Sequence, residues 1–208
     1  MPTIEIRPDG PYAVTGVETF RNGDGKPIVH AEQVMKLCRC GGSQNKPFCD
    51  GTHKRNGFTG ARVADGSADK LKSYTGPGIT IHDNRSVCMH AARCTGGLPE
   101  VFKYGERPWI DPAGAIPQKI VETVRRCPSG ALSYTLEGTE PKPESWPPSI
   151  DVVKDGPYEV LGVELIGVEF AKGVPRERYA LCRCGASKNK PFCDASHVAI
   201  GFKDPGSL

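Results

Sequence analysis

The sequence predicts an α+β fold in which two small β-rich modules flank an inserted α+β domain. Nine cysteines in a chain of 208 residues fall into three clusters of three, and the segments around the first and last clusters repeat one another. A hydrophobic share of 38% with 7% aromatic residues supplies a thin core, and small domains stapled by metal suit such a composition. With 25 Gly and 19 Pro, we expect folded modules that are rich in turns.

The repeat begins upstream of the cysteines. Residues 6–18 align with residues 152–164 through a shared Asp-Gly-Pro-Tyr segment. This segment indicates a tight turn in each copy, and the alternation of polar and apolar residues over 158–165 predicts a half-buried strand after it. Each copy is therefore expected to form a small β-rich unit.

Each copy then contains three thiols and one imidazole at the same spacing. The two sets are Cys38, Cys40, Cys49 and His53, and Cys182, Cys184, Cys193 and His197. An odd number of thiols cannot pair completely within a set, and the N-terminal residues lack the basic and apolar regions of a secretory signal, so disulfides are disfavoured. Judged by the donor atoms alone, zinc remains an alternative metal, because thiolates suit both zinc and iron–sulfur clusters. The spacing, however, is unusual for zinc, since zinc fingers usually separate the first two cysteines by two or more residues.

Both stretches, 38–53 and 182–197, resemble the CDGSH-type iron–sulfur domain. They share Cys-Arg-Cys-Gly, Asn-Lys-Pro-Phe-Cys-Asp and a final Thr-His or Ser-His. The resemblance implies a [2Fe-2S] cluster in each, with Cys38 and Cys40 on the inner iron and Cys49 and His53 on the outer one. Replacing a thiolate with a neutral imidazole removes negative charge, so the potential should exceed that of all-cysteine ferredoxins. The second imidazole nitrogen can gain or lose a proton, which would couple electron and proton transfer.

The residues between the two modules contain the third cysteine cluster. Cys88 and Cys94 occupy the first and third positions of the bacterial ferredoxin motif, with Ala91 in place of the middle cysteine, and Cys127 followed by Pro supplies a further thiol. Apolar residues on one side predict a helix over 117–126, with Pro in its first turn; they are Ile116, Ile120, Val121 and Val124. With strands expected at 78–83 and 131–136, residues 70–137 resemble the divergent single-cluster ferredoxin domain.

Three thiols leave one corner of an iron–sulfur cube without a cysteine ligand. The simplest occupant is a [3Fe-4S] cluster, in which the fourth iron is absent. The alternative is a [4Fe-4S] cluster with a fourth ligand from His90, water or a partner. A loop histidine beside a cluster can also act as a hydrogen-bond donor, and we leave His90 out of the ligand set.

Polar side chains near the two motifs are candidates for holding the clusters. They are Ser43, Lys46, Asp50, Ser187, Lys190 and Asp194. The aspartates are expected to cap the short helices that carry the histidines, the lysines to fix the loops over the clusters, and the serines to donate to sulfur. Ala195 replaces Gly51 of the first motif, which would be strained if φ is positive there. His30 and His82 are expected to be ordinary surface or strand residues.

We expect four segments along the chain. Residues 1–66 form the first module, 67–138 the insert, 139–150 a Pro-rich, semi-rigid linker and 151–208 the second module. Family members with a single motif are homodimers, so two copies in one chain imply an internal pseudo-twofold pair and a monomer.

The rest of the composition narrows the function. The net charge of +3 comes from mixed charges without a Lys and Arg run, so nucleic acid is not an expected partner, and no apolar stretch is long enough to span a membrane. No catalytic constellation stands out, and we expect no enzyme. The leading hypothesis is a cytoplasmic electron-transfer protein with two [2Fe-2S] clusters and one [3Fe-4S] cluster, which meets redox partner proteins. The alternatives are a donor of clusters to apo iron–sulfur acceptors, a redox sensor, or a zinc-stapled interaction module.

Overall fold

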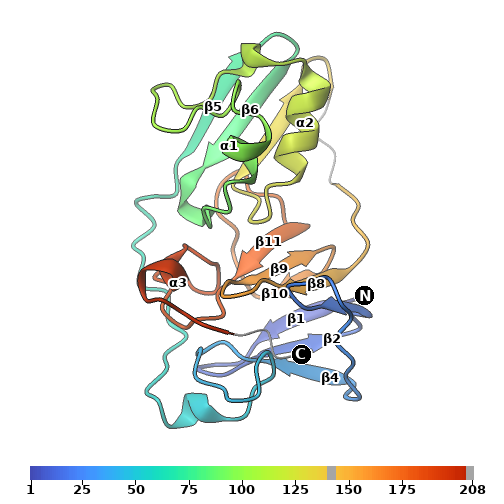
Figure 1. Cartoon of the computed structure of the whole chain (residues 1–208), viewed down its shortest axis with the longest axis vertical. Coiled ribbons are helices and arrows are strands. Elements are labelled where there is room, and N and C mark those ends of the chain that lie inside the picture. The colour runs from blue at the N-terminus through green and yellow to red at the C-terminus, as the bar shows by residue number, and fades with distance from the viewer. Residues whose placement is uncertain (140–143, 205–208) are drawn as a thin grey trace.

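Three small β-sheets and a few short helices make up the α+β fold (Figure 1). The computed structural model describes residues 1–139 and 144–204. Residues 140–143 of the expected linker lie outside this described part. Along the long axis the insert lies at one end, the sheet of the second module in the middle, and the sheet of the first module at the other end (Figure 1).

The first sheet has the strand order β10-β1-β2-β4. Its strands are β1 (Thr3–Ile6), β2 (Tyr12–Thr15), β4 (Val34–Leu37) and β10 (Glu164–Ile166). The second sheet has the order β11-β9-β8-β3. Its strands are β3 (Thr19–Arg21), β8 (Ser149–Val152), β9 (Tyr158–Leu161) and β11 (Arg178–Leu181).

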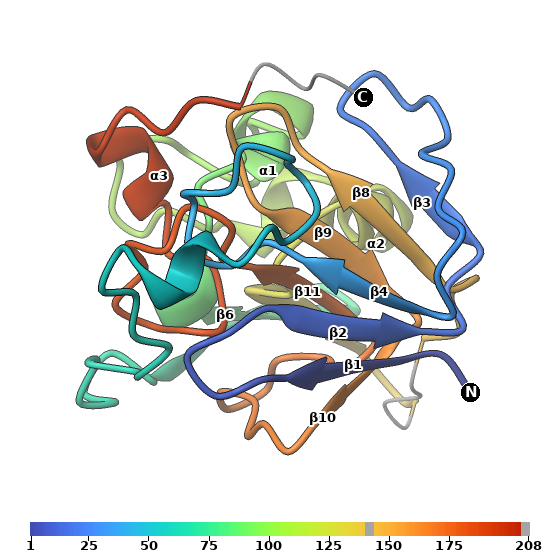
Figure 2. The same cartoon turned by 90° about the horizontal axis from the view of Figure 1, so that it is seen from below.

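Each of these two sheets takes one strand from the other module. β10 pairs in parallel with β1, and β3 pairs in parallel with β8 (Figure 2). The expected strand over 158–165 is broken, because Gly162 takes a φ of 61° and the chain then crosses to the other sheet. The exchange forms the expected internal pseudo-twofold pair, and segments 1–66 and 151–208 therefore share their sheets.

The insert contains an antiparallel sheet of order β5-β6-β7. Its strands are β5 (Leu71–Gly76), β6 (Ile79–Asn84) and β7 (Leu132–Leu136). The expected helix is α2 (Pro117–Arg125), which begins at its proline and buries Ile120 and Val124. Ile116 was expected on the same apolar side, but it is 59% exposed because it precedes the helix in an extended conformation.

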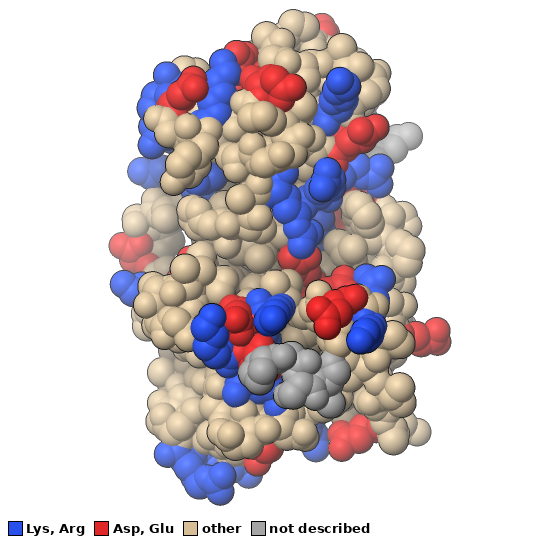
Figure 3. Space-filling view, in the orientation of Figure 1, with Lys and Arg blue, Asp and Glu red and all other residues tan. Residues whose placement is uncertain are grey.

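The remaining helices are short, and most of them lie beside cysteines. They are η1 (Thr52–Lys54), η2 (Arg85–Val87), α1 (Arg93–Gly97), η3 (Pro112–Gly114) and α3 (Ser196–Ala199). In the part of the chain that the structure describes, no helix combines the length and apolar character needed to cross a bilayer. On the face shown in Figure 3, basic and acidic side chains alternate, as the mixed charge of the sequence predicts.

Candidate metal centres

In the first motif the four candidate ligands fall into two close pairs. Cys38 Sγ lies 3.9 Å from Cys40 Sγ, and Cys49 Sγ lies 3.4 Å from Nδ1 of His53. β4 ends just before the first pair, while the second pair spans the loop into η1. The sulfur separation matches two thiolates on one tetrahedral metal, which at a metal–sulfur distance of about 2.3 Å lie about 3.8 Å apart.

The second motif repeats this arrangement. Cys182 Sγ and Cys184 Sγ are 3.8 Å apart, and Cys193 Sγ is 3.4 Å from Nδ1 of His197. Among residues 1–139 and 144–204, no group of three or more His, Cys, Asp or Glu side chains is placed to hold a single metal ion. The second motif therefore offers its four candidate ligands in the same two pairs as the first.

Backbone amides, rather than the expected serine hydroxyls, donate to the sulfur atoms. The amides of Gly42 and Ala186 point at Cys40 Sγ (3.4 Å) and Cys184 Sγ (3.5 Å). The Ser43 hydroxyl donates instead to the carbonyl oxygen of Phe48 at 2.6 Å. Ser187 does the same with Phe192. The prediction for the serines is therefore wrong, because each has one proton and gives it to the loop backbone.

The lysines hold the loops as expected. Lys46 Nζ donates to the carbonyl oxygen of Ser43 at 2.6 Å, and Lys190 Nζ to that of Ser187 at 2.8 Å. Each contact ties the Asn-Lys-Pro turn back to the residues after the Cys-Arg-Cys segment. The lysines thus shape the protein around the ligands.

The aspartates hydrogen-bond to the first turns of the short helices, but they occupy the position before the N-cap, whereas the N-cap itself was expected. Asp50 accepts from the amides of Thr52 (3.0 Å) and Gln44 (2.8 Å), and these hydrogen bonds hold its pKa well below the usual range. Asp194 accepts from Ser196 in the same way; burial alone would raise its pKa, but its hydrogen bonds lower the pKa overall. The N-cap positions belong to Gly51 and Ala195.

Both N-cap residues adopt the left-handed conformation. The φ angles are 85° at Gly51 and 68° at Ala195. Because a Cβ is disfavoured in this region, the alanine of the second motif is strained where the first motif has glycine.

The two motifs touch each other through their glycines. A Cβ added at Gly41 would lie 2.5 Å from the carbonyl oxygen of Cys184, and one at Gly185 would lie 2.7 Å from that of Cys40. Only glycine permits so close a backbone approach at both places. The pseudo-twofold pair therefore brings the two candidate centres together.

In the insert, the three cysteines come from different segments and share one environment. Burial raises the pKa of the Cys94 thiol to about 11, with further increases from the charges of Cys127 and Cys88. Burial also raises the pKa of Cys88, and Cys127 adds to the increase. The charges of neighbouring cysteines thus contribute to the pKa of both Cys88 and Cys94, and the three thiols are the candidate ligands of the insert. The side chain of His90 is exposed, on a loop where its φ is 56°.

Arg178 is a neighbour of this cluster that sequence reasoning missed. Its buried guanidinium belongs to β11 of the second module, and Nη1 donates to the carbonyl oxygen of Cys127 at 2.8 Å. In the described part of the chain it forms no ion pair within 4.0 Å. Burial lowers the pKa of Arg178, while the nearby Cys127 raises it. No local pattern could have revealed the contact, because 51 residues separate donor and acceptor.

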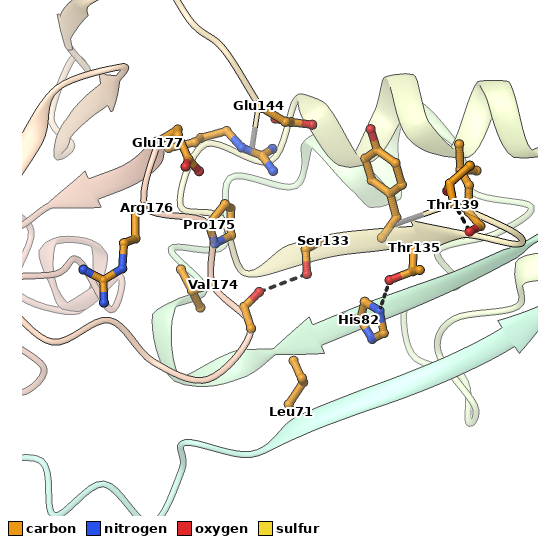
Figure 4. A pocket seen from close by; sticks show the side chains of 14 residues that line it. Leu71, His82, Ser133, Thr135, Thr139, Glu144, Val174, Pro175, Arg176 and Glu177 are labelled. Atoms are coloured by element: carbon orange, nitrogen blue, oxygen red, sulfur yellow. Dashed lines mark hydrogen bonds between the residues drawn. The ribbon is translucent and has the colours of Figure 1, made fainter. Parts of the chain in front are cut away.

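A pocket of about 820 Å³ lies away from the cysteines, between the insert sheet and residues 173–178 (Figure 4). Its walls include Leu71, Ser133 and Arg176. His82 lies on its edge, where its ring bonds to Ser73 and Thr135 across neighbouring strands at 2.9 Å each. His82 is thus the ordinary strand residue that was expected.

Comparisons with known proteins agree with this geometry. The family model described as "Iron-binding zinc finger CDGSH type" matches residues 9–54 and 155–198, and the model described as "Divergent 4Fe-4S mono-cluster" matches residues 74–137. "Uncharacterized protein YjdI" of Escherichia coli strain K12 is 35% identical over 63 residues, which is 30% of this chain and 83% of the relative. The protein of the same name from strain O157:H7 matches to the same extent. No solved structure gives a significant match.

The fold and the paired ligand sets define an α+β iron–sulfur protein. The chain belongs to the CDGSH-type family, with a divergent mono-cluster ferredoxin domain between its two motifs.

Proposed function

We propose that this protein is a multi-cluster electron carrier. The observation that carries the proposal is the duplicated pairing of ligands, 3.9 and 3.4 Å apart in one motif and 3.8 and 3.4 Å apart in the other. The motifs would each hold a [2Fe-2S] cluster, and the insert would hold a third cluster. The ligands proposed for the three centres are Cys38, Cys40, Cys49 and His53; Cys182, Cys184, Cys193 and His197; and Cys88, Cys94 and Cys127.

The histidines would couple proton transfer to electron transfer. Nδ1 of His53 and of His197 faces the neighbouring cysteine sulfur, which leaves Nε2 to exchange a proton. Both side chains are only partly buried, so solvent can supply that proton. The potentials of these two centres should therefore depend on pH.

For the insert we propose a [3Fe-4S] cluster, with [4Fe-4S] as the alternative. The exposed Ala91 and the absence of a fourth cysteine in the Cys88 loop support the three-iron form, whereas the description of the matching family model favours four irons. EPR of the oxidised protein tests the choice. A three-iron cluster is paramagnetic when oxidised, and a silent oxidised spectrum would exclude it.

We propose a monomeric, cytoplasmic carrier without enzymatic activity of its own, whose partners are redox proteins. The strand exchange supports the monomer, because it already supplies each module with a partner within the chain.

A second candidate function is the donation of clusters to apo iron–sulfur proteins, with redox sensing as a related role. It is favoured by the part-exposed pair of Cys49 and His53 in the first module, since exposed ligands release metal more readily. Mixing the loaded protein with an apo-ferredoxin separates the two functions. A carrier keeps its [2Fe-2S] spectrum and exchanges only electrons, whereas a donor loses that spectrum as the acceptor gains a cluster.

A further inference from the structure

The insert covers the second motif more than the first, although the two motifs are repeats of each other. In the second module Ala180 is 2% exposed and Cys193 is 3% exposed. Their counterparts by strand register and motif position are Lys36, which is exposed, and Cys49, which is partly exposed. The difference arises because Met89 of the insert packs against Ala180 and Cys193, and the insert stacks on the sheet of the second module (Figure 1).

Met89 makes the contact between the insert and the second centre. It follows Cys88 directly in the chain, is 6% exposed, and packs against Ala180 and Cys193. Burial raises the pKa of Cys193 to about 12, and the charge of Cys88 is one of the additional causes. Because Met89 directly follows Cys88 in the chain, its packing against Cys193 brings the proposed ligands of the two centres near each other.

Polar contacts hold the insert in this orientation. Asn189 Nδ2, in the cluster loop of the second module, donates to the carbonyl oxygen of Ser86 at 2.8 Å. Arg93, next to Cys94, donates to both carboxylate oxygens of Glu159 at 2.6 and 2.8 Å.

Asn189 has a matched counterpart in the first module. Asn189 is 4% exposed, whereas the equivalent Asn45 of the first motif is exposed. The same residue type therefore faces the insert in one copy and solvent in the other.

We infer that the insert and the second module form the electron-exchanging pair across Met89, and that the first module exchanges electrons with the second across the Gly41–Cys184 and Gly185–Cys40 contacts. This inference rests on the proposed function. An external one-electron carrier protein supplies the electron. That carrier is oxidised by one electron as the insert is reduced by one. The insert is then oxidised by one electron as the second module is reduced by one, and no bond forms or breaks.

Electron spin relaxation in the loaded, full-length protein tests the pairing. Cys49→Ala removes the first [2Fe-2S] centre and Cys193→Ala the second, so each variant reduced with dithionite shows one remaining [2Fe-2S] signal. We expect the signal in Cys49→Ala to resist microwave saturation, because the paramagnetic insert lies close by. The signal in Cys193→Ala should saturate at lower power. Adding Cys127→Ala to Cys49→Ala removes the insert cluster and should make that signal saturate easily.

A second set of variants does not depend on removing a centre of the pair. In the Cys49→Ala background, Asn189→Ala and Met89→Ala should make the signal easier to saturate, while Met89→Leu, which restores the buried volume, should leave it resistant. Asn45→Ala in the same background is the matched control and should have no effect.

The outcomes separate this inference from the proposed function. Purified protein that contains no iron overturns both. The pairing alone is overturned if the unaltered protein carries all three centres but the remaining signals of Cys49→Ala and Cys193→Ala saturate equally, or the signal of Cys193→Ala relaxes faster.

Discussion

The rings of Tyr12 and Tyr158 meet edge to face with their centroids 6.1 Å apart. The Tyr12 hydroxyl donates to the carbonyl oxygen of Cys182, and the Tyr158 hydroxyl donates to that of Cys38, each at 2.9 Å. Burial is the main cause that raises the pKa of both phenols far above the usual value, so both stay protonated as donors. Each module therefore fastens the ligand loop of the other.

Removing either hydroxyl should weaken the ligand loop of the other module, at Cys182 for Tyr12 and at Cys38 for Tyr158. We expect Tyr12→Phe and Tyr158→Phe each to lower the free energy of unfolding by about 1–3 kcal/mol, because a buried carbonyl loses its donor. Denaturant unfolding of the loaded protein, followed by visible absorbance, measures the change. Tyr104→Phe is the control, since Tyr104 is 91% exposed. Tyrosine variants as stable as this control would contradict the role of the pair.

The two N-cap positions should respond to substitution with opposite signs. Ala195→Gly relieves a left-handed alanine and Gly51→Ala creates one, with open space around Gly51. We expect the first to stabilise and the second to destabilise the protein by about 1 kcal/mol. Thermal unfolding of the two variants provides the comparison. A shift of the same sign in both would show that backbone strain does not decide these positions.

The close approach of the motifs predicts a larger effect at Gly41. Gly41 and Gly51 both have positive φ, but only at Gly41 would a Cβ meet backbone, 2.5 Å from the Cys184 oxygen. Gly41→Ala should therefore destabilise the protein more than Gly51→Ala and reduce the iron content of both motifs. Equal loss of stability in the two variants would mean that the loops separate easily.

The histidines should set the pH dependence of the two [2Fe-2S] potentials. Reduction adds negative charge, so the imidazole holds its proton more tightly in the reduced state. The potential should then fall as pH rises between the oxidised and reduced pKa values, by up to roughly 59 mV per unit. His53→Cys and His197→Cys should each lower the potential of their own centre and flatten its slope in protein-film voltammetry. A slope unchanged from wild type in either variant would show that its histidine is not a ligand.

Local motifs predicted the candidate ligand sets, the turns and several of the strands and helices, because ligand spacing and turn residues act over short stretches of chain. The helix at Pro117 and the insert strands β6 and β7 follow from periodicity in the same way, whereas β5 was not predicted. The exchange of β3 and β10 could not be predicted, since it depends on pairing between segments more than a hundred residues apart. The serine hydroxyls were misassigned for a related reason. Their acceptors are fixed by the fold of the loop and not by residue type.

Metal and sulfide analysis of the purified, fully loaded protein tests the central claim most directly. Two [2Fe-2S] centres and one [3Fe-4S] centre predict about seven irons per chain, or about eight with the four-iron alternative, together with inorganic sulfide and little zinc. Stoichiometric zinc without sulfide would contradict the account.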